Sequence, residues 1–453
     1  MKILYTVHVY MPKWTFGTEK YTHGVAKWFQ SRGHEVMVVT CESNVQGDSP
    51  EVSATQDLWE GVPVHRLTFN NLLGEDPARA DYYNPYVDKY LRSLLEKEKP
   101  DLVHVCHAGH LSTAVFTAPQ ALGIPVVSTL TDFWLICPTS QLLRYDQKLC
   151  AGPSSPSRCV RCYAYQRGLG GKYRGAIESI PTGILDVAVR ATGPLPAAPD
   201  RHLALVRAIA RRSDWMNQVM RMAEVFFSPS DFLRRMFVAN GMEAERIRWS
   251  PHSIDPSWTK DLPPRQRTGD LRFAYIGMIA PHKGVHVLLE AFRGLPQTRG
   301  ATLTLYGDTE AYGSYWRQLE PLVQADPDIR YGGKFAHDRL PQVLSGVDVL
   351  VLPSTWYENT PTIMYEAFAA GIPVIASDIG GMAELISTYR GGWTFPVGDS
   401  VALRSRIQSL VGNANLVVEA GACILPVPTI ADHCTDLAEA YVQSVEKRTI
   451  EVT

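Results

Sequence analysis

Two glutamates near residue 360 have the chemical type and spacing to bind hydroxyl groups. The segment LVLPSTWYENTPTIMYEAFAAG places Glu358 just before an expected helix and Glu366 inside it. Thr360 is the expected N-cap and Pro361 the first helical residue, so the free amides of the first turn and the helix dipole form a site for an anion or a hydroxyl. Asn359 adds a short polar group at the same opening. Together these groups can hydrogen-bond the hydroxyls of a sugar and of a ribose.

A lysine at the start of another expected helix is the second candidate. In YIGMIAPHKGVHVLLEAF a strand ends at Gly277, and Lys283 with Gly284 opens the helix. A cation is unfavourable at a helix N-terminus, so this placement favours an anion, such as a diphosphate, between the lysine and the amides. For an isolated lysine or glutamate, a solvated surface position is the better interpretation.

A glycine near the N-terminus gives a weaker signal. In YMPKWTFGTEK, Gly17 precedes Thr18, the expected cap of a helix that runs to about Gly33. A glycine there lets a ligand approach the backbone closely. One glycine before a helix is common, so the signal carries little weight alone.

Four cysteines follow the pattern C-x12-C-x8-C-x2-C. This number and the terminal CxxC suit a tetrahedral structural zinc. Free thiols or a disulfide are the alternatives, and a chain without a secretion signal seldom keeps disulfides. We predict one structural zinc that braces the surrounding segment, and no catalytic metal. The predicted ligands are Cys137, Cys150, Cys159 and Cys162.

The elements that must position these residues form two successive α/β domains. Continuous apolar strand patterns alternate with amphipathic helix patterns, which is typical of doubly wound, Rossmann-like parallel sheets. We expect an N-terminal domain over 1–262, a C-terminal domain over 263–428, and a final segment, 429–453, whose helix can pack back on the first domain. Ligands bind at the carboxyl ends of such strands, so the cleft between the domains is the expected site.

The N-terminal domain carries an expected insertion at about 138–205. It holds the four cysteines, a Gly-rich run at 167–175 and a Pro-rich run at 192–200. The stretch KYRGAIESIPTGILDVAVRATG mixes basic and apolar residues, and a membrane, an acceptor or the rest of the fold can cover it. The run ALVRAIARRSDWMNQVMR reads as a packed helix with a solvated face.

Composition excludes some functional classes. The chain has 453 residues, of which 45% are hydrophobic and 20% charged, with a net charge of −2. This balance argues against a protein that holds nucleic acid by bulk charge. No run approaches the length of a membrane span, and Thr6, His8 and Pro12 interrupt the N-terminal apolar run. We expect a cytoplasmic protein, with peripheral membrane contact left open and its oligomeric state not indicated.

Taken together, the loops resemble those of the retaining glycosyltransferases of family 4, which have the GT-B fold of two facing Rossmann-like domains. The resemblance covers nearly the whole chain except 163–210 and 411–428, and Glu358 and Glu366 match the family's E-x7-E motif. It rests on the segments FGTEKYTHGVAKWFQSRGHEV, GMIAPHKGVHVLLEAF and WYENTPTIMYEAFAAGIPVIASDIGGMAEL.

The resemblance implies roles for the residues that match. Glu358 would contact the donor sugar beside the amides of Asn359 and Thr360, Glu366 would hold the ribose, and Lys283 would bind the diphosphate.

The resemblance also implies contacts from other loops. Gly17 would line the diphosphate from the other domain, and the main chain near Lys334 and Phe335 would meet the base. One departure is Met278, which stands where the family commonly has an arginine, with His282 as a partial substitute.

A second departure lies in the loop LTDFWLICP. Thr131 stands where the family often has a histidine before a retained aspartate, Asp132. His107 and His110, after the strand LVHVC, are the nearest alternatives on the acceptor side. Each alone is more commonly a structural histidine.

The resemblance therefore implies a metal-independent, retaining hexosyltransferase with Glu358, Lys283 and Asp132 as catalytic residues. The donor would be a nucleoside diphosphate sugar, with UDP- and GDP-sugars favoured, and the acceptor a glycan, a lipid-linked molecule or a small molecule. A non-catalytic sugar-nucleotide-binding protein, a GT-B epimerase and a phosphorylase are the alternatives, and a phosphorylase would need a Schiff-base lysine that the sequence does not identify.

Overall fold

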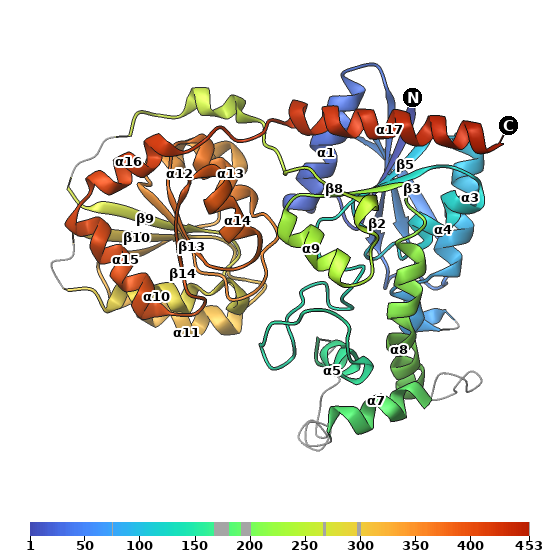
Figure 1. Ribbon diagram of the computed structural model, residues 1–453, viewed down its shortest axis with the longest axis horizontal. Coiled ribbons are helices and arrows are strands. Elements are labelled where there is room, and N and C mark those ends of the chain that lie inside the picture. The colour runs from blue at the N-terminus through green and yellow to red at the C-terminus, as the bar shows by residue number, and fades with distance from the viewer. Residues whose placement is uncertain (75, 167–180, 192–200, 266–268, 297–299, 453) are drawn as a thin grey trace. The chain divides into compact units, whose positions relative to one another are not determined.

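The computed structural model describes residues 1–74, 76–166, 181–191, 201–265, 269–296 and 300–452 (Figure 1). The Gly-rich run at 167–175 and the Pro-rich run at 192–200 lie outside these residues. The chain divides into two compact units. The first comprises Met1–Pro229, Leu233–Pro251 and Ile430–Thr453, and the second comprises Ser230–Phe232 and His252–Thr429.

The first unit is built on an eight-stranded sheet of order β3-β4-β2-β1-β5-β6-β7-β8. All neighbouring strands pair in parallel except β3 and β4, which are antiparallel. The strands are β1 (Lys2–Val7), β2 (Glu35–Ser43), β3 (Ser53–Trp59), β4 (Val62–Thr68), β5 (Leu102–Val105), β6 (Val126–Thr129), β7 (Val225–Ser228) and β8 (Ile247–Trp249). The fully buried parallel strands are those that the sequence pattern predicts.

Strand β3 was not predicted from the sequence. It lies at the edge of the sheet and its residues are almost all exposed. A solvated edge strand lacks the apolar run on which the prediction relied.

Helices flank this sheet and occupy the long connection between β6 and β7 (Figure 1). The helices of the first unit are α1 (Gly17–Gln30), α2 (Pro77–Ala80), α3 (Pro85–Glu98), α4 (Ala114–Ala121), α5 (Pro156–Gln166), α7 (Thr182–Ala191), α8 (Arg201–Val219), most of α9 (Asp231–Ala239) and α17 (Ile430–Val452), with short 3-10 turns at Asn71–Leu73 and Ala244–Arg246.

The last helix, α17, packs in the first unit against α1 (Figure 1). Tyr441 is fully buried and its ring stacks on Phe29, with centroids 4.9 Å apart. Its hydroxyl also hydrogen-bonds the ring of buried His104 on β5. His433, about two turns earlier in α17, bonds the hydroxyl of Tyr21 at 2.8 Å. The C-terminal helix is thus part of the hydrophobic core of this unit.

The second unit contains a six-stranded, fully parallel sheet of order β11-β10-β9-β12-β13-β14. Its strands are β9 (Leu271–Ile276), β10 (Ala301–Tyr306), β11 (Ile329–Gly333), β12 (Val349–Leu352), β13 (Val374–Ser377) and β14 (Gly392–Phe395). Its helices are α10 (Val285–Arg293), α11 (Gly313–Gln324), α12 (Leu340–Ser345), α13 (Thr362–Ala369), α14 (Gly380–Tyr389), α15 (Ser400–Gly412) and α16 (Asn415–Cys423), with 3-10 turns at Pro256–Asp261, Pro281–Lys283 and His337–Arg339. The prediction of two parallel-sheet α/β domains is confirmed.

Each sheet has a point at which the strand order reverses. In the first unit it lies between β1 and β5, and in the second between β9 and β12. Loops that leave the carboxyl ends of the strands on either side diverge there and leave an opening for a ligand. Among the helices that the structure describes, none is both long and apolar enough to cross a membrane.

The packing of α17 yields a stability prediction. Tyr441→Ala removes a buried aromatic ring and leaves Nδ1 of His104 without its partner, so we expect a loss of about 3–5 kcal/mol. Val442→Ala is the matched control, because the neighbouring Val442 is 45% exposed; it should change stability by less than about 0.5 kcal/mol. Urea unfolding followed by tryptophan fluorescence measures both, and equal effects would contradict the assigned core position.

Candidate functional sites

The clearest site in the second unit surrounds Glu358. The loop after β9 carries Lys283 and the loop after β12 carries Glu358, so both leave the two strands that flank the reversal of strand order. The ammonium Nζ of Lys283 lies 2.5 Å from Oε1 of Glu358. The same oxygen accepts hydrogen bonds from the indole N–H of Trp356 at 2.7 Å and the hydroxyl of Ser354 at 2.9 Å.

These contacts determine the charge of Glu358. Burial by itself raises the pKa of this carboxyl, but Lys283 and the hydrogen bonds from Trp356 and Ser354 outweigh burial, and the pKa is lowered. Glu358 is therefore ionised at neutral pH although only 8% of it is exposed. Among the described residues no group hydrogen-bonds its second oxygen, Oε2, which remains able to accept a ligand hydroxyl.

A glycine allows these two loops to approach each other. Gly284 has φ +71° and follows Lys283 directly. A Cβ atom at this position would lie 1.9 Å from the carbonyl oxygen of Pro353 at the end of β12. Only glycine tolerates both the left-handed conformation and this contact. The lysine reaches Glu358 because the backbones meet here.

Two further glycines hold the other side of the Glu358 loop. The amide of Gly381 donates a 2.9 Å hydrogen bond to the carbonyl of Glu358. A Cβ on Gly381 would lie 1.3 Å from the carbonyl oxygen of Asn359, and one on Gly380, which has φ +58°, 2.7 Å from that of Glu358. The side-chain amide oxygen of Asn359 accepts a bond from Ser230 at 3.1 Å.

The helix after this loop starts one residue later than predicted from the sequence. Pro361 is the N-cap of α13, Thr362 is its first residue, and no side chain caps it. The prediction that Thr360 is the cap was wrong, because a residue before proline is driven towards extended conformations. Thr360 is instead 7% exposed, and its hydroxyl has no hydrogen-bond partner among the residues that the structure describes. It is a buried polar group beside Glu358 that a ligand can satisfy.

The second predicted glutamate, Glu366, lies in α13 and is 9% exposed. Its Oε1 lies 2.8 Å from Nε2 of His337, which lies in the 3-10 turn after β11. His337 was not predicted from the sequence as a site residue, although it follows Lys334 and Phe335 in the same strand-end loop. Lys334 itself turns to Asp308, with Nζ and Oδ2 2.9 Å apart.

Phe335 packs on the core of the second unit with its ring edge-on to Tyr306. This aromatic contact anchors the loop that was predicted to meet the base, and the loop is close in sequence to the His337–Glu366 pair.

His282 is a poor substitute for the missing arginine. It is only 8% exposed and its ring contacts Trp356, with centroids 4.6 Å apart. Burial, reinforced by the charge of Lys283, lowers the pKa of His282 to about 4. The imidazole is neutral at pH 7 and supplies no positive charge. At the position of the expected arginine, the carbonyl of Met278 accepts a 2.7 Å hydrogen bond from Tyr275.

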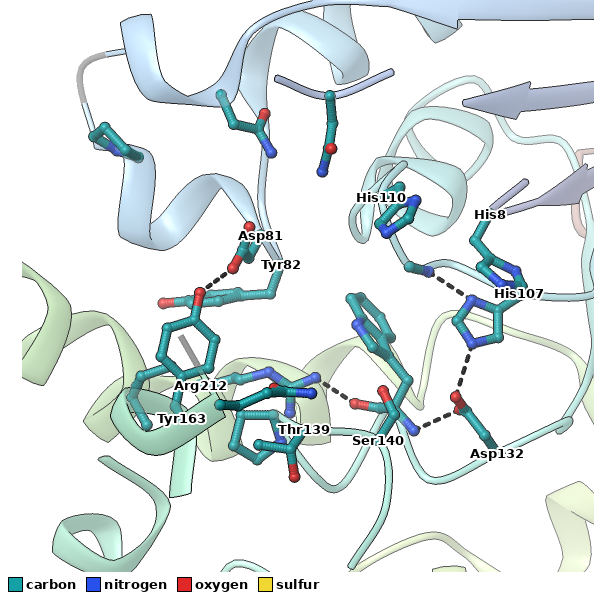
Figure 2. Close-up of a pocket in the computed structure, with 18 of the residues that line it drawn as sticks. His8, Asp81, Tyr82, His107, His110, Asp132, Thr139, Ser140, Tyr163 and Arg212 are labelled. Atoms are coloured by element: carbon teal, nitrogen blue, oxygen red, sulfur yellow. Dashed lines mark hydrogen bonds and ion pairs between the residues drawn. The ribbon is translucent and has the colours of Figure 1, made fainter. Parts of the chain in front are cut away.

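A separate pocket of about 480 Å³ lies in the first unit (Figure 2). His8 follows β1 and His107 follows β5, so the pocket opens at the reversal of strand order in this sheet. Asp132, in the loop after β6, also lines it. The pocket is thus lined by side chains from strand-end loops, which is where the sequence predicted the functional side chains.

His107 and Asp132 form the central pair of the pocket. Nε2 of His107 lies 2.9 Å from Oδ2 of Asp132, and the amide of Gly109 donates to Nδ1 of His107 at 2.9 Å (Figure 2). Because Nδ1 accepts, Nε2 carries the proton and donates to the carboxylate. The other oxygen of Asp132 accepts from the amide of Trp134 at 2.7 Å.

His8 extends this pair and was not predicted as a site residue. Its ring centroid lies 4.1 Å from that of His107, and its Nε2 lies 3.4 Å from a carboxylate oxygen of Glu19. Burial is the main cause that lowers the pKa of His8 well below its ordinary value, and the neighbouring histidines lower it further. Burial raises the pKa of Glu19. His8 is identified by the same rule that identified His107, since it follows a buried strand directly.

The other predicted acceptor-side residues lie close by but differ in role. His110 lines the pocket, is exposed, and has φ +62°. Thr131 directs its hydroxyl to the carbonyl of Cys106 at 3.2 Å. Gly17 is the exposed first residue of α1, whose N-cap is Phe16 and not Thr18 as predicted, since Phe16 is the last extended residue.

The four predicted zinc ligands line one cavity of about 20 Å³. All four thiols are free. Burial, together with the smaller effect of the neighbouring cysteines, raises the pKa of Cys159 to about 12. Burial raises the pKa of Cys162 to about 11. Within the described ranges no three or more His, Cys, Asp or Glu side chains are arranged to hold a metal ion. This arrangement does not support the zinc site, which stays a prediction.

Each unit contains a region that matches a known protein family. Residues 16–169 match the family "Glycosyl transferase 4-like domain" and residues 270–413 the family "Glycosyl transferases group 1". The chain is 31% identical over 426 residues to glycogen synthase of Mycobacterium tuberculosis. The aligned region covers 91% of this chain and 86% of that protein.

Other matches are shorter or more distant. The amylovoran biosynthesis glycosyltransferase AmsK of Erwinia amylovora is 30% identical over 208 residues, 43% of this chain, and the match spans about half of its length, 49%. Sucrose-phosphate synthase from Thermosynechococcus elongatus has a similar fold, with a TM-score of 0.63, 16% identity and 98% of each chain covered.

The glycine contacts predict a stability effect. Gly381→Ala introduces a methyl group where a carbonyl oxygen already lies, so the Glu358 loop must move, at a cost of about 1–3 kcal/mol or more. Gly412→Ala, at a helix position with no atom within 4 Å, is the control and should be neutral or slightly stabilising. Thermal unfolding compares them. A Gly381→Ala midpoint equal to the wild-type value would refute the close approach.

The zinc prediction is tested by metal analysis of protein purified without chelator. We expect about one equivalent of zinc per chain, lost in Cys159→Ser. Cys423→Ser is the control, since Cys423 is exposed and outside the cluster. Zinc well below one equivalent in the wild-type protein would show that the thiols serve only as packed side chains.

Proposed function

The chain belongs to the family-4 glycosyltransferases of GT-B fold, and from this premise we propose that it transfers a hexose from a nucleoside diphosphate sugar to an acceptor with retention of the anomeric configuration. The donor binds to the second unit, and the acceptor to the pocket of the first. A UDP- or GDP-sugar is the favoured donor. No catalytic metal takes part.

The observation that carries this proposal is the contact between Lys283 and Glu358 at the reversal of strand order in the second unit. A cation and an ionised carboxylate meet there 2.5 Å apart, beside the unpaired hydroxyl of Thr360. A donor diphosphate needs a cation, and its sugar needs hydroxyl acceptors. Both requirements are met within one loop cluster.

The proposed reaction breaks the bond between the anomeric carbon and the diphosphate oxygen. A new bond forms between that carbon and an acceptor oxygen, and the acceptor proton passes to the leaving diphosphate. Negative charge accumulates on the leaving group, and the ammonium of Lys283 stabilises it. Catalysis of this kind depends on positioning and electrostatics, without a covalent protein intermediate.

Glu358 and Glu366 have separate tasks in this proposal. Oε1 of Glu358 is occupied by Lys283, Trp356 and Ser354, so Oε2 accepts hydroxyl groups of the donor sugar. Glu366, held by His337, accepts the ribose hydroxyls.

The His107–Asp132 pair is proposed to hold the acceptor hydroxyl in the first unit. His107 has no free lone pair that could take the acceptor's proton. The lone pair of Nδ1 accepts a hydrogen bond from Gly109, and Nε2 donates to Asp132. The pair therefore orients the acceptor through the carboxylate, and the leaving diphosphate is the base.

A screen of donors tests the function. We expect one of UDP-glucose, GDP-mannose, ADP-glucose or dTDP-glucose to raise the unfolding temperature, with about 2.7 kcal/mol of stabilisation at a hundredfold excess over its dissociation constant. The protein should also slowly hydrolyse that donor, and NMR of the first-formed sugar should show the donor's anomeric configuration. Binding without hydrolysis or transfer would instead indicate a non-catalytic sugar-nucleotide-binding protein, and an inverted product would exclude retention.

Glu366→Ala should weaken donor binding, because the ribose loses an ionised acceptor worth about 1.5–3 kcal/mol, or tenfold to more than a hundredfold in dissociation constant. Glu419→Ala, which removes an exposed glutamate from α16 of the same unit, is the control and should bind normally. Calorimetry with the donor identified above measures both. Unchanged affinity in folded Glu366→Ala would remove this residue from the donor site.

A further inference from the structure

The pocket of the first unit contains a buried cation that the proposed reaction does not use. Arg212, on α8, lines the pocket and is 5% exposed. Its guanidinium hydrogen-bonds the carbonyl of Trp134 and lies over the ring of the same residue, 5.1 Å from its centroid. The sequence pattern predicted a packed helix with a solvated face, and Arg212 lies on the buried side of this helix.

The guanidinium has no ionic partner in the part of the chain that the structure describes. No carboxylate there lies within ion-pair distance of it, and the Trp134 carbonyl is its one hydrogen-bond acceptor. An arginine has five N–H donors, so most of them lack a protein acceptor. A buried charge without a counter-ion is costly, and such a site attracts an anion.

The two carboxylates in the pocket already have partners. Asp132 is bonded to His107 and to the amide of Trp134. Asp81 accepts a hydrogen bond from the hydroxyl of Tyr163. Neither is paired with Arg212, so the guanidinium is left to bind an anionic group of a ligand.

We propose that the acceptor carries an anionic group, a carboxylate or a phosphate, which Arg212 binds inside this pocket. The guanidinium fork matches either group with two parallel hydrogen bonds. The assignment of this ligand as the acceptor rests on the proposed transferase function.

The geometry separates the anion from the reacting hydroxyl. Figure 2 shows Arg212 beside Tyr82 and Tyr163 at one end of the pocket, and the His107–Asp132 pair at the other. A cavity of about 480 Å³ is within the range that holds a small organic ligand. An acceptor with a charged group at one end and a hydroxyl at the other fits both.

Three probes test the inference by calorimetry on the full chain: methyl β-D-glucuronide, glucose 6-phosphate and neutral methyl β-D-glucoside. We expect at least one anionic probe to bind about tenfold or more tightly than the neutral one, equivalent to about 1.4 kcal/mol. A preference for the glucuronide assigns a carboxylate and one for the phosphate ester a phosphate. Equal affinity of all three for the wild-type protein would overturn the proposal without any variant.

Variants assign the preference to Arg212. In Arg212→Gln the anionic and neutral probes should bind with about equal affinity. In Arg212→Lys, which keeps the charge, part of the preference for the anionic probe should remain. Arg211→Gln is the matched control, because the neighbouring Arg211 on α8 is exposed; it should retain the full preference. A full preference in Arg212→Gln, or its loss in Arg211→Gln, would overturn the assignment.

The donor measurements keep the two proposals apart. A protein that selects anionic probes through Arg212 but neither binds nor hydrolyses any sugar nucleotide has the anion site without the transferase function. A protein that hydrolyses its donor and shows no anion selectivity has the function without the anionic acceptor.

Discussion

The close approach of backbones around Glu358 is the constraint on which the second unit's site depends. The loop that carries this residue lies between Gly284 on one side and Gly380 and Gly381 on the other, and side-chain atoms at these positions would collide with neighbouring carbonyl groups. Because glycine lets the two backbones approach this closely, Lys283 lies within reach of the carboxylate. The energy of the ion pair then sustains a charge that burial alone would neutralise.

In both units the reversal of strand order positions the candidate site, but the side chains at the two sites differ. Where the strand order of a parallel sheet reverses, adjacent loops diverge and expose the carboxyl ends of two strands. In the second unit these loops carry a lysine and a glutamate, which suit a phosphate and hydroxyl groups. In the first they carry His8 and His107, which are aligned by the carboxylates of Glu19 and Asp132, with Arg212 added from a helix. Position follows from the fold, while ligand chemistry follows from the side chains placed there.

Burial and hydrogen-bond partners together determine which of these groups carry charge. His282 is neutral because it is enclosed, so Lys283 acts without a second cation from that loop. Glu358 is equally enclosed but ionised, because three donors converge on one of its oxygens. Burial lowers the pKa of Arg212, but a guanidinium titrates so far above neutrality that it keeps its charge at physiological pH, and within the described residues it hydrogen-bonds a carbonyl alone. At the opening of its sheet the second unit thus holds a paired lysine and glutamate, whereas the first holds a guanidinium with no ion pair among the described residues.

The sequence by itself determined the two parallel sheets and the positions of Glu358, Lys283 and His107, because continuous apolar strands and strand-end loops are local patterns that burial imposes on the chain. It could not reveal the exposed edge strand β3, which has no apolar run, or the start of α13, where proline shifted the cap by one residue. Only the tertiary structure decided the partners: Lys283 with Glu358, His337 with Glu366, and the inward turn of Arg212. These contacts join segments distant along the chain, and their distances depend on how the backbone packs, which no local pattern records.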